Sequence, residues 1–563
     1  MSTTRRTASD KGLFPKLVLI KRHLGIFPIV ILIILTAFIC QCRNNVIDEF
    51  RNNLAVVLVS DPMILKDGSD YYLYATSIAA KDRGFEVWHS TDMVNWRYKG
   101  LCFEKNVATW SQHAFWAPEC VKAGDTYYLY FSAALEAGEY TSTKKVCVAA
   151  AKSPLGPFIE LSAPLFEDEC STIDAHLFED SDGRKYLYYA REVRAPNGVG
   201  LPLVENQIFM RSMRDYDVAE DDPTFCTKAT QPWELKSFGG LVRWNEAPWV
   251  LKKGGIYYLM YSANCFALSD YSVGYATANS PYGPWTKYAG NPILKKTTDV
   301  SGPGHNCIVT TSDNEMWIGY HSHTGDGGEQ RQLNLDRIQW NGDELFVHGP
   351  TTALQKYPAG GFALSGSSDN FNSPVLDAKW LIASEEPSDW NLDSENGSLA
   401  VTGSQGNTTG SAHNYQNIFL QHAPRGDFMI STTVTMKTTA YHDQANLYVW
   451  QNDDNYLRMA IGRLDLFGSK IGWTCELAGA YTSSLVNKRL GDTITLAIRK
   501  CGNTYQCLYY DHGWVQVGPE ISAEFAPIKV GISAMSCPWG NHVKAYFHDF
   551  VLTPTGNFAG RHG

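Results

Sequence analysis

Residues 244–262, WNEAPWVLKKGGIYYLMYS, place one carboxylate ahead of a turn and an aromatic strand. Four other segments carry the same strand after the same turn: DGSDYYLYATS from Asp67, AGDTYYLYFS from Ala123, DGRKYLYYA from Asp182 and, more loosely, DNEMWIGYHS from Asp313. The chain therefore repeats one structural plan.

The spacing of these strands indicates the architecture. Their first residues lie 56, 59, 71 and 59 residues apart, at Tyr71, Tyr127, Tyr186, Tyr257 and Met316. A period of this size fits one four-stranded blade with its connections, and such a period is typical of a β-propeller. We predict five blades.

One residue upstream of each aromatic strand is a candidate for the central axis. Counting back 10, 11, 12, 11 and 11 residues from the strand starts gives Asp61, Trp116, Asp174, Glu246 and His305. The innermost strands of a propeller line its central channel, so equivalent positions converge there. We therefore expect three acids, a tryptophan and a histidine to face one cavity.

The composition bounds the class of protein. With 563 residues, of which 13% are aromatic, the chain is globular and too long for one ordinary domain. The net charge of -10 gives no basic surface for nucleic acid, so nucleic acid is not expected as a partner.

The first 50 residues differ from the rest. Six basic residues precede an apolar run at residues 24–40. Its seventeen residues fit an uncleaved membrane anchor or a cleaved signal peptide, and either exports the remainder. A lipidated Cys40 or Cys42 is a third reading, disfavoured because a large residue precedes each cysteine. We expect a secreted, periplasmic or cell-surface protein. The N-terminal segment could attach it to the membrane.

Cysteine usage gives a weaker signal. Eleven cysteines follow the N-terminal segment, and the simplest reading is buried free thiols with at most a disulfide or two. Cys501 and Cys507 flank an expected hairpin and are the first pair to suspect.

The repeats and the changes in composition divide the chain. We assign residues 1–50 to the N-terminal segment, 51–356 to the propeller, 357–368 to a linker and 369–563 to a second domain. In the third blade, insertions at residues 194–206 and 215–234 are expected to form loops at the cavity mouth. After the linker, alternating strands with Gly, Asn and Asp turns predict a β-sandwich, so the fold class is all-β.

Two carboxyl groups across a sugar-sized cavity are the minimum for glycoside hydrolysis. Asp61, Asp174 and Glu246 supply three, although each alone could cap a turn or face solvent. Three acids at one axis are costly to desolvate, so their common register favours catalysis.

Three further residues are candidates for substrate binding. Trp116 could stack on a sugar ring or only fill the core. His305 could contact substrate or metal, or be a buried structural imidazole. Arg331, after the Gly-rich stretch GDGGEQR, could face substrate or solvent.

As a set, the motifs SDPMILKDGSDYYLYATS, FWAPECVKAGDTYYLYFS, STIDAHLFEDSDGRKYLYY, NEAPWVLKKGGIYYLMYS and GPGHN resemble glycoside hydrolase family 43, the five-bladed propeller enzymes. The resemblance implies that Asp61 is the general base, Asp174 adjusts and orients the acid, and Glu246 is the general acid. It implies inversion at the anomeric carbon, with the base and the acid roughly 6.5 to 9.5 Å apart. His305 matches the family's axial histidine, and Arg331 its substrate-facing arginine.

The C-terminal region, from SSDNFNSPVLDAKW to FHDFVLTP, is similar to the jelly-roll, concanavalin-like sandwich that often follows this propeller. Such domains can bind calcium or sugar, or add a loop to the active-site rim. Glu119 and Cys120 superficially resemble the acid-bearing pair of invertase-like enzymes, but the Asn-Asp-Pro-Asn signature of those enzymes is absent, since Asp61 lies in SDPM.

The resemblance implies an oligo- or polysaccharide substrate with α-L-arabinofuranosyl or β-D-xylosyl linkages, in exo or endo action. No cofactor is needed for this chemistry, a structural calcium ion is conceivable, other metal content is unknown, and a monomer is expected. The alternatives are a fructan- or galactan-active hydrolase on the same scaffold, a non-catalytic cell-surface glycan-binding propeller and, less favoured, a propeller that serves as a protein-interaction platform.

Overall fold

The computed structural model describes residues 46–554, except 48, 53–57, 79, 81, 139–142, 197–201, 221, 326, 359–362, 365, 394–395, 407, 409–413, 425, 466–467, 487–490 and 527. The predicted signal or anchor segment, including the apolar run 24–40, lies outside these residues. Among the described residues, no helix is long and apolar enough to cross a membrane.

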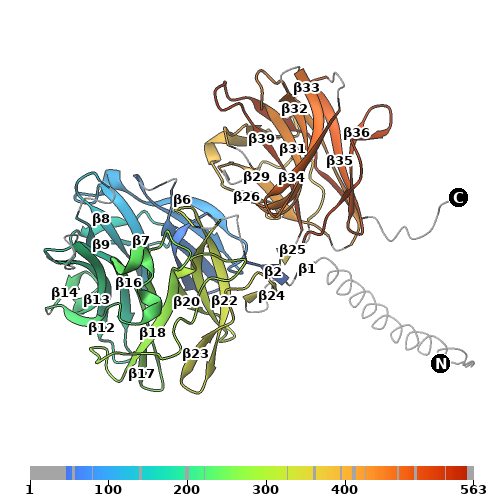
Figure 1. The fold of residues 1–563 in the computed structure, drawn as a ribbon. Coiled ribbons are helices and arrows are strands. Elements are labelled where there is room, and N and C mark those ends of the chain that lie inside the picture. Colours follow the sequence, from blue (N-terminus) through green and yellow to red (C-terminus); the bar gives the residue numbers. More distant parts are fainter. Residues whose placement is uncertain are drawn as a thin grey trace, which may run out of the picture. The chain divides into compact units, whose positions relative to one another are not determined.

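The first domain is built from antiparallel sheets that follow one another along the chain (Figure 1). The first two sheets are β3 (Ser60–Asp67), β4 (Asp70–Thr76), β5 (Gly84–Ser90) and β6 (Arg97–Glu104), then β7 (His113–Ala123), β8 (Thr126–Ala134), β9 (Lys145–Ala151) and β10 (Ile159–Ser162). The last is β20 (Gly304–Thr310), β21 (Met316–His323), β22 (Arg331–Asn341) and β23 (Glu344–Val347).

The third and fourth sheets are joined to each other. The third comprises β11 (Thr172–Glu179), β12 (Lys185–Pro196) and β13 (Pro202–Asp215), with β14 (Val218–Ala219) and β15 (Thr224–Thr227) beside β13. The fourth comprises β16 (Val242–Lys253), β17 (Ile256–Ala263), β18 (Ser272–Ala278) and β19 (Thr286–Lys287). Strand β13 pairs in parallel with β16 over Val204, Glu205 and Asn206, which links the two sheets.

This pairing corrects the prediction of long mouth loops in the third blade. The described parts of residues 194–206 lie in the strands β12 and β13, and residues 215–234 contribute the short strands β14 and β15. Residues 202–209 pair one by one with β12, from Pro202 opposite Pro196 to Phe209 opposite Tyr189, so the described part of the insertion extends the hairpin.

The aromatic strands recur because both faces of each blade are buried. Successive side chains of a strand point to opposite faces, so Leu73 packs toward the fifth blade and Tyr74 toward the second. In the same way, Tyr257 packs toward the third blade and Tyr258 toward the fifth. Continuous runs such as YYLY supply apolar surface to two layers at once.

The first strands of the five sheets lie next to one another in the order β3, β7, β11, β16 and β20, and β20 also contacts β3. Figure 1 shows β16 and β20 near the middle of the assembly, with β14 and β23 at its outside. The fold is a five-bladed β-propeller, as predicted.

A short antiparallel pair accompanies the fifth blade. Strand β2 (Glu49–Arg51) pairs with β24 (Leu354–Lys356). The amide of Asn52 donates to the carbonyl of Leu335 at 2.8 Å, and the Leu335 N–H donates to Asn52 Oδ1 at 2.7 Å. These bonds tie the segment before the first blade to β22.

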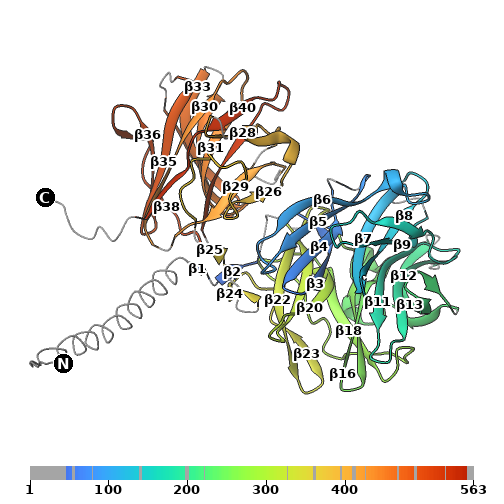
Figure 2. The same cartoon turned by 180° about the vertical axis from the view of Figure 1, so that it is seen from behind.

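The second domain is a sandwich of two sheets (Figure 2). One contains β26 (Leu381–Ala383), β29 (Ile418–His422), β39 (Lys529–Met535), β31 (Gln444–Asn452), β32 (Asn455–Asp465), β33 (Gly468–Leu477) and β34 (Ala480–Val486). The other contains β27 (Trp390–Asp393), β28 (Ser398–Thr402), β40 (Lys544–Phe547), β30 (Phe428–Met436), β35 (Thr493–Cys501), β36 (Thr504–Tyr510) and β37 (Trp514–Gln516). The short strands β38 (Ile521–Ser522) and β41 (Val551–Pro554) pair with β36 and β30.

One hydrophobic core takes side chains from both sheets of the sandwich, among them Leu447 and Ile532 from one sheet and Leu496 and Phe547 from the other. This is the packing that the alternating strands predict. The remaining short strands are β1 (Val46–Ile47) and β25 (Ala363–Leu364). The helical elements that lie entirely within the described residues are 3₁₀ turns at Lys105–Val107, Pro232–Glu234, Ser237–Gly240 and Pro387–Asp389.

The suspected disulfide between Cys501 and Cys507 is wrong. All eleven cysteines from Cys102 to Cys537 are free, and nine are buried. Cys501 pairs across the hairpin with Thr504, and Cys507 with Ile498, so the two thiols are not opposite one another. Burial of small apolar thiols explains their abundance.

Candidate active site

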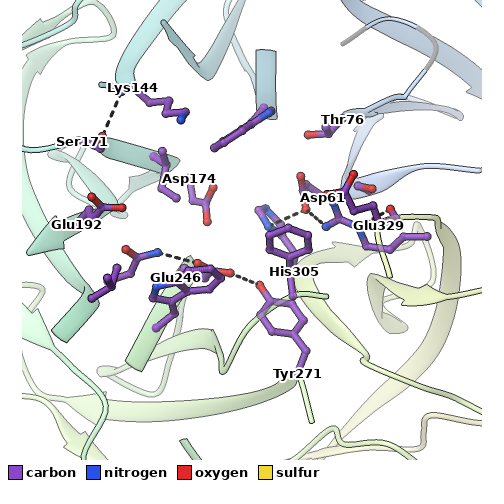
Figure 3. Close-up of a pocket in the computed structure, with 18 of the residues that line it drawn as sticks. Asp61, Thr76, Lys144, Ser171, Asp174, Glu192, Glu246, Tyr271, His305 and Glu329 are labelled. Atoms are coloured by element: carbon purple, nitrogen blue, oxygen red, sulfur yellow. Dashed lines mark hydrogen bonds and ion pairs between the residues drawn. The ribbon is translucent and has the colours of Figure 1, made fainter. Parts of the chain in front are cut away.

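A cavity of about 720 Å³ opens among the first strands of the propeller. It is lined by all six residues proposed from the sequence: Asp61, Trp116, Asp174, Glu246, His305 and Arg331. Figure 3 shows Asp61, Asp174 and Glu246 pointing toward one shared space. The structure thus brings three acids together that lie 113 and 72 residues apart in sequence.

A β-bulge in each first strand shapes the floor of this cavity. The ladder between the first and second strands is interrupted in every blade, at a residue with a positive φ: Asp61 (53°), Ala117 (46°), Asp174 (56°), Ala247 (51°) and His305 (50°). The second blade has an additional interruption at Ala114 (53°). Non-glycine residues rarely adopt this conformation, and it concentrates at functional sites.

The bulges correct the predicted register. Asp61, Asp174 and His305 occupy the left-handed position, but Trp116 and Glu246 lie one residue before it. The bulge residues of those two blades, Ala117 and Ala247, are each followed by a proline. The extra residue of a bulge turns the strand locally, so both side chains still line the cavity.

Asp61 lies among cationic and imidazole groups. Its Oδ1 accepts a hydrogen bond from Arg331 Nη1 at 3.0 Å and lies 3.2 Å from His305 Nδ1 and 3.4 Å from His321 Nδ1. Although burial acts to raise it, Arg331 and the two imidazoles hold the pKa of Asp61 well below its usual value. Asp61 is therefore an ionised carboxylate at neutral pH.

Glu246 has the opposite environment. Burial raises its pKa to about 7, although hydrogen bonds from Tyr271 and Asn206 act to lower it. The Tyr271 hydroxyl donates to Oε1 at 2.8 Å, and Asn206 Nδ2 donates to Oε2 at 2.9 Å. Glu246 thus retains a proton up to near-neutral pH, as a general acid requires.

Asp174 is the third buried carboxylate. Burial raises its pKa well above the usual value, and the nearby carboxylates of Glu246 and Asp61 raise it further. Its Oδ2 accepts a hydrogen bond from the Ala247 N–H at 3.0 Å. The side chain is thereby attached to the backbone of the residue that follows Glu246.

Aromatic side chains support these groups. Arg331 lies 4.7 Å from the ring centroid of Phe266, and Phe266 stacks on Trp244 with a centroid distance of 6.2 Å. On another wall, Lys144 Nζ lies 4.5 Å from the ring centroid of Trp116. These contacts fix a guanidinium and an ammonium where polar groups of a ligand would enter.

The sequence did not indicate several residues of the site, among them Asn206, Tyr271, His321, Lys144 and Phe266. Asn206 comes from the third strand of its blade, and Tyr271 directly precedes β18, so neither shares the register of the first strands. The one available signal for Asn206 was the unusual length of the third blade. Glu119, by contrast, contacts the third blade, where its Oε1 accepts the Leu177 N–H at 2.9 Å.

No group of three or more His, Cys, Asp or Glu side chains in the described part of the chain could hold a metal ion. The conceivable calcium ion therefore has no such ligand set there.

Comparison with known proteins agrees with this geometry. Residues 50–346, more than half of the chain, match the family described as glycosyl hydrolases family 43. Residues 368–551 match the β-xylosidase C-terminal concanavalin A-like domain.

A solved structure, a thermostable family-43 glycoside hydrolase, is 41% identical and covers 55% of this chain and 99% of its own, with a TM-score of 0.51. A family-43 protein of Bacillus licheniformis is 20% identical and covers 90% of this chain and 100% of its own, with a TM-score of 0.56, which supports the two-domain fold.

Among curated relatives, a β-D-galactofuranosidase of Aspergillus niger is 27% identical over 50% of this chain and 79% of its own length. Other relatives are named a xylan 1,3-β-xylosidase of Vibrio and extracellular α-L-arabinofuranosidases of Streptomyces avermitilis and Cellvibrio japonicus. Another is an extracellular arabinanase of Bacillus subtilis.

A propeller cavity with an ionised and a protonated carboxyl group, together with these relatives, defines a glycoside hydrolase. The chain belongs to glycosyl hydrolase family 43. Its substrate is a carbohydrate, and enzymes of this family need no cofactor for catalysis.

Proposed function

We propose that the protein is an inverting glycosidase in which Asp61 is the general base and Glu246 the general acid. The observation that carries this is the opposite environment of two carboxyl groups in one cavity, ionised at Asp61 and protonated at Glu246. A water activated by Asp61 attacks the anomeric carbon while Glu246 protonates the leaving oxygen. Asp174 adjusts the proton affinity of Glu246 and its orientation.

Trp116, His305 and Arg331 bind the substrate in this proposal. Trp116 offers an aromatic surface to a sugar ring. His305 and Arg331 both contact Asp61, so they orient the base as well as facing the sugar. The structure also supports Lys144 and Asn206 as polar contacts, since both line the cavity.

The proposed substrates are α-L-arabinofuranosyl or β-D-xylosyl linkages of plant-type polysaccharides. The names of several relatives support this choice. The galactofuranosidase of Aspergillus niger favours a second candidate, a hexofuranoside, so such a substrate belongs in the same panel.

We also propose a localisation, an oligomeric state and a test for calcium. The enzyme is exported, in keeping with relatives named as extracellular, and the N-terminal segment is its signal or its membrane attachment. We expect a monomer. A structural calcium ion in the sandwich would appear as a rise in the melting temperature on adding calcium after chelation.

The test compares aryl α-L-arabinofuranoside, aryl β-D-xyloside, aryl β-D-galactofuranoside and natural arabino- and xylo-oligosaccharides. Glu246→Gln should abolish oligosaccharide hydrolysis. The variant should keep more activity on the aryl glycosides, because their activated leaving group needs little protonation. Asp61→Asn should abolish both. Proton NMR of the first-formed product should show the inverted anomer.

Full activity of Glu246→Gln on the oligosaccharide would refute the assignment of the acid. Sugar binding without turnover of any substrate would instead indicate a glycan-binding propeller.

A further inference from the structure

The backbone amide of each bulge residue donates a hydrogen bond toward the preceding blade. In four blades the acceptor is a side chain on the second strand of that preceding blade. The pairs are Ala117 to Thr76 Oγ1 (2.8 Å), Asp174 to Ser132 Oγ (3.1 Å), His305 to Ser262 Oγ (2.8 Å) and Asp61 to His321 Nδ1 (3.1 Å).

These four acceptors occupy one equivalent position. Each lies opposite the residue just before its own bulge: Thr76 opposite Ser60, Ser132 opposite Trp116, Ser262 opposite Glu246 and His321 opposite Gly304. Each of these four blades thus satisfies the bulge amide of the next blade, because a buried N–H without a partner is costly.

The third blade is the exception. The same position there is Ala190, opposite Ile173 and fully buried. A methyl group accepts no hydrogen bond, so the Ala247 amide has no second-strand acceptor. It donates instead to Oδ2 of Asp174, at 3.0 Å.

We propose that Ala190 is a positioning residue for the Asp174 carboxylate: because it presents no acceptor, the Ala247 amide holds Asp174 beside Glu246. This inference rests on the proposed function and deepens it, since it names what orients the third acid. The blade that lacks a second-strand acceptor is the blade that carries Asp174.

The expected effect on catalysis follows from charge. Asp174 and Glu246 face Asp61, Arg331, Tyr271 and Asn206, and repulsion between neighbouring carboxylates is mutual. The Ala247 N–H favours the ionised form of Asp174, so of the two neighbouring acids Glu246 keeps the proton. Without this hydrogen bond Asp174 takes the proton more readily, and Glu246 loses its own at lower pH.

The test is Ala190→Ser, which installs the acceptor that Ser132 and Ser262 provide at the same position. The serine should take the Ala247 amide and release Asp174. We expect kcat on a natural oligosaccharide to fall about 10- to 100-fold with KM little changed, as small misplacements of catalytic groups do. The alkaline limb of the pH profile should move to lower pH.

Two further substitutions at Ala190 control for the size of the added side chain. Ala190→Cys adds a larger atom that accepts hydrogen bonds only weakly, and Ala190→Gly adds nothing, so both should keep the wild-type pH profile. Equal losses in the Ser and Cys variants would indicate simple overpacking and overturn the inference. So would a serine variant with wild-type kcat and pH profile.

A crystal structure of the Ala190→Ser variant separates this inference from the proposed function. Serine Oγ accepting the Ala247 amide, with the Asp174 carboxylate displaced, supports the positioning role even if no tested glycoside is hydrolysed. An intact bond between Asp174 and Ala247 in that variant overturns it.

Discussion

The hydroxyl group of Tyr271 donates a hydrogen bond to Oε1 of Glu246 at 2.8 Å, and the tyrosine is fully buried. Its ring lies parallel to that of His321, with a centroid distance of 5.6 Å. Tyr271 therefore connects the acid to the imidazole that accepts the backbone N–H of Asp61. One side chain links the two carboxyl groups of the proposed reaction.

Replacing Tyr271 with Phe removes a hydrogen bond that favours the charged form of Glu246, so the pKa of Glu246 should rise above about 7. The acid must be protonated, so activity is lost as pH rises through this pKa. The alkaline limb of kcat/KM should therefore move to higher pH. Tyr258→Phe, which loses a bond to the Asp343 carbonyl outside the cavity, is the control. An unmoved limb would contradict the assignment.

Replacing Arg331 with Gln should raise the pKa of Asp61, because the guanidinium holds it low. The base must be ionised, so activity appears as pH rises through its pKa. We expect the acidic limb to move up by about 1 to 3 pH units. Arg337→Gln is a matched control, since Arg337 is on the same strand and lies over Trp317, outside the cavity. The prediction fails if both variants shift the limb equally.

Replacing Gly304 with Ala should destabilise the propeller and reduce activity together. A Cβ at this position would lie 2.2 Å from two carbons of the Tyr271 ring, too close for any side chain. Overpacking of this kind costs about 1 to 3 kcal/mol and would displace the ring that holds Glu246. Thermal unfolding and kcat of Gly304→Ala and of Gly325→Ala, whose Cβ would meet nothing within 4 Å, test this. Equal melting temperatures would argue against the close contact.

Of the eleven thiols from Cys102 to Cys537, Cys501 is the exposed one. A thiol reagent added to the native protein should react rapidly with Cys501. The Cys501→Ser variant should have one fewer rapidly reacting thiol. Reducing agent should leave the melting temperature unchanged, because no disulfide closes the hairpin. A marked fall in melting temperature on reduction would contradict the free thiols.

Much of the fold could be predicted because the pattern that encodes it is local. An aromatic strand after a tight turn is readable wherever a blade buries both faces, as Leu73 and Tyr74 do. The convergence of Asp61, Asp174 and Glu246 followed from spacing alone, and all three line one cavity. Their roles stay predictions.

The features of the site that could not be predicted depend on pairing between strands that are far apart in the sequence. Whether a strand is bulged is decided by its partner and by the amide acceptor in the neighbouring blade, so the one-residue offset of Trp116 and Glu246 was not visible. Asn206 reaches Glu246 because β13 pairs in parallel with β16, a contact between two blades. The two residues of that contact are too far apart in the chain to form a local sequence pattern.

The pairing of β2 with β24 has a consequence for the order of the chain. It brings the residues just before the first blade beside those just after the fifth, so a short linker could join residues 51 and 354. New ends could then be opened at an exposed turn such as the one at Gly68, where no neighbouring atom lies within 4 Å of the added Cβ position. A circularly permuted propeller should keep the same cavity, because the position of the three acids depends on which blades are neighbours and not on which blade is made first.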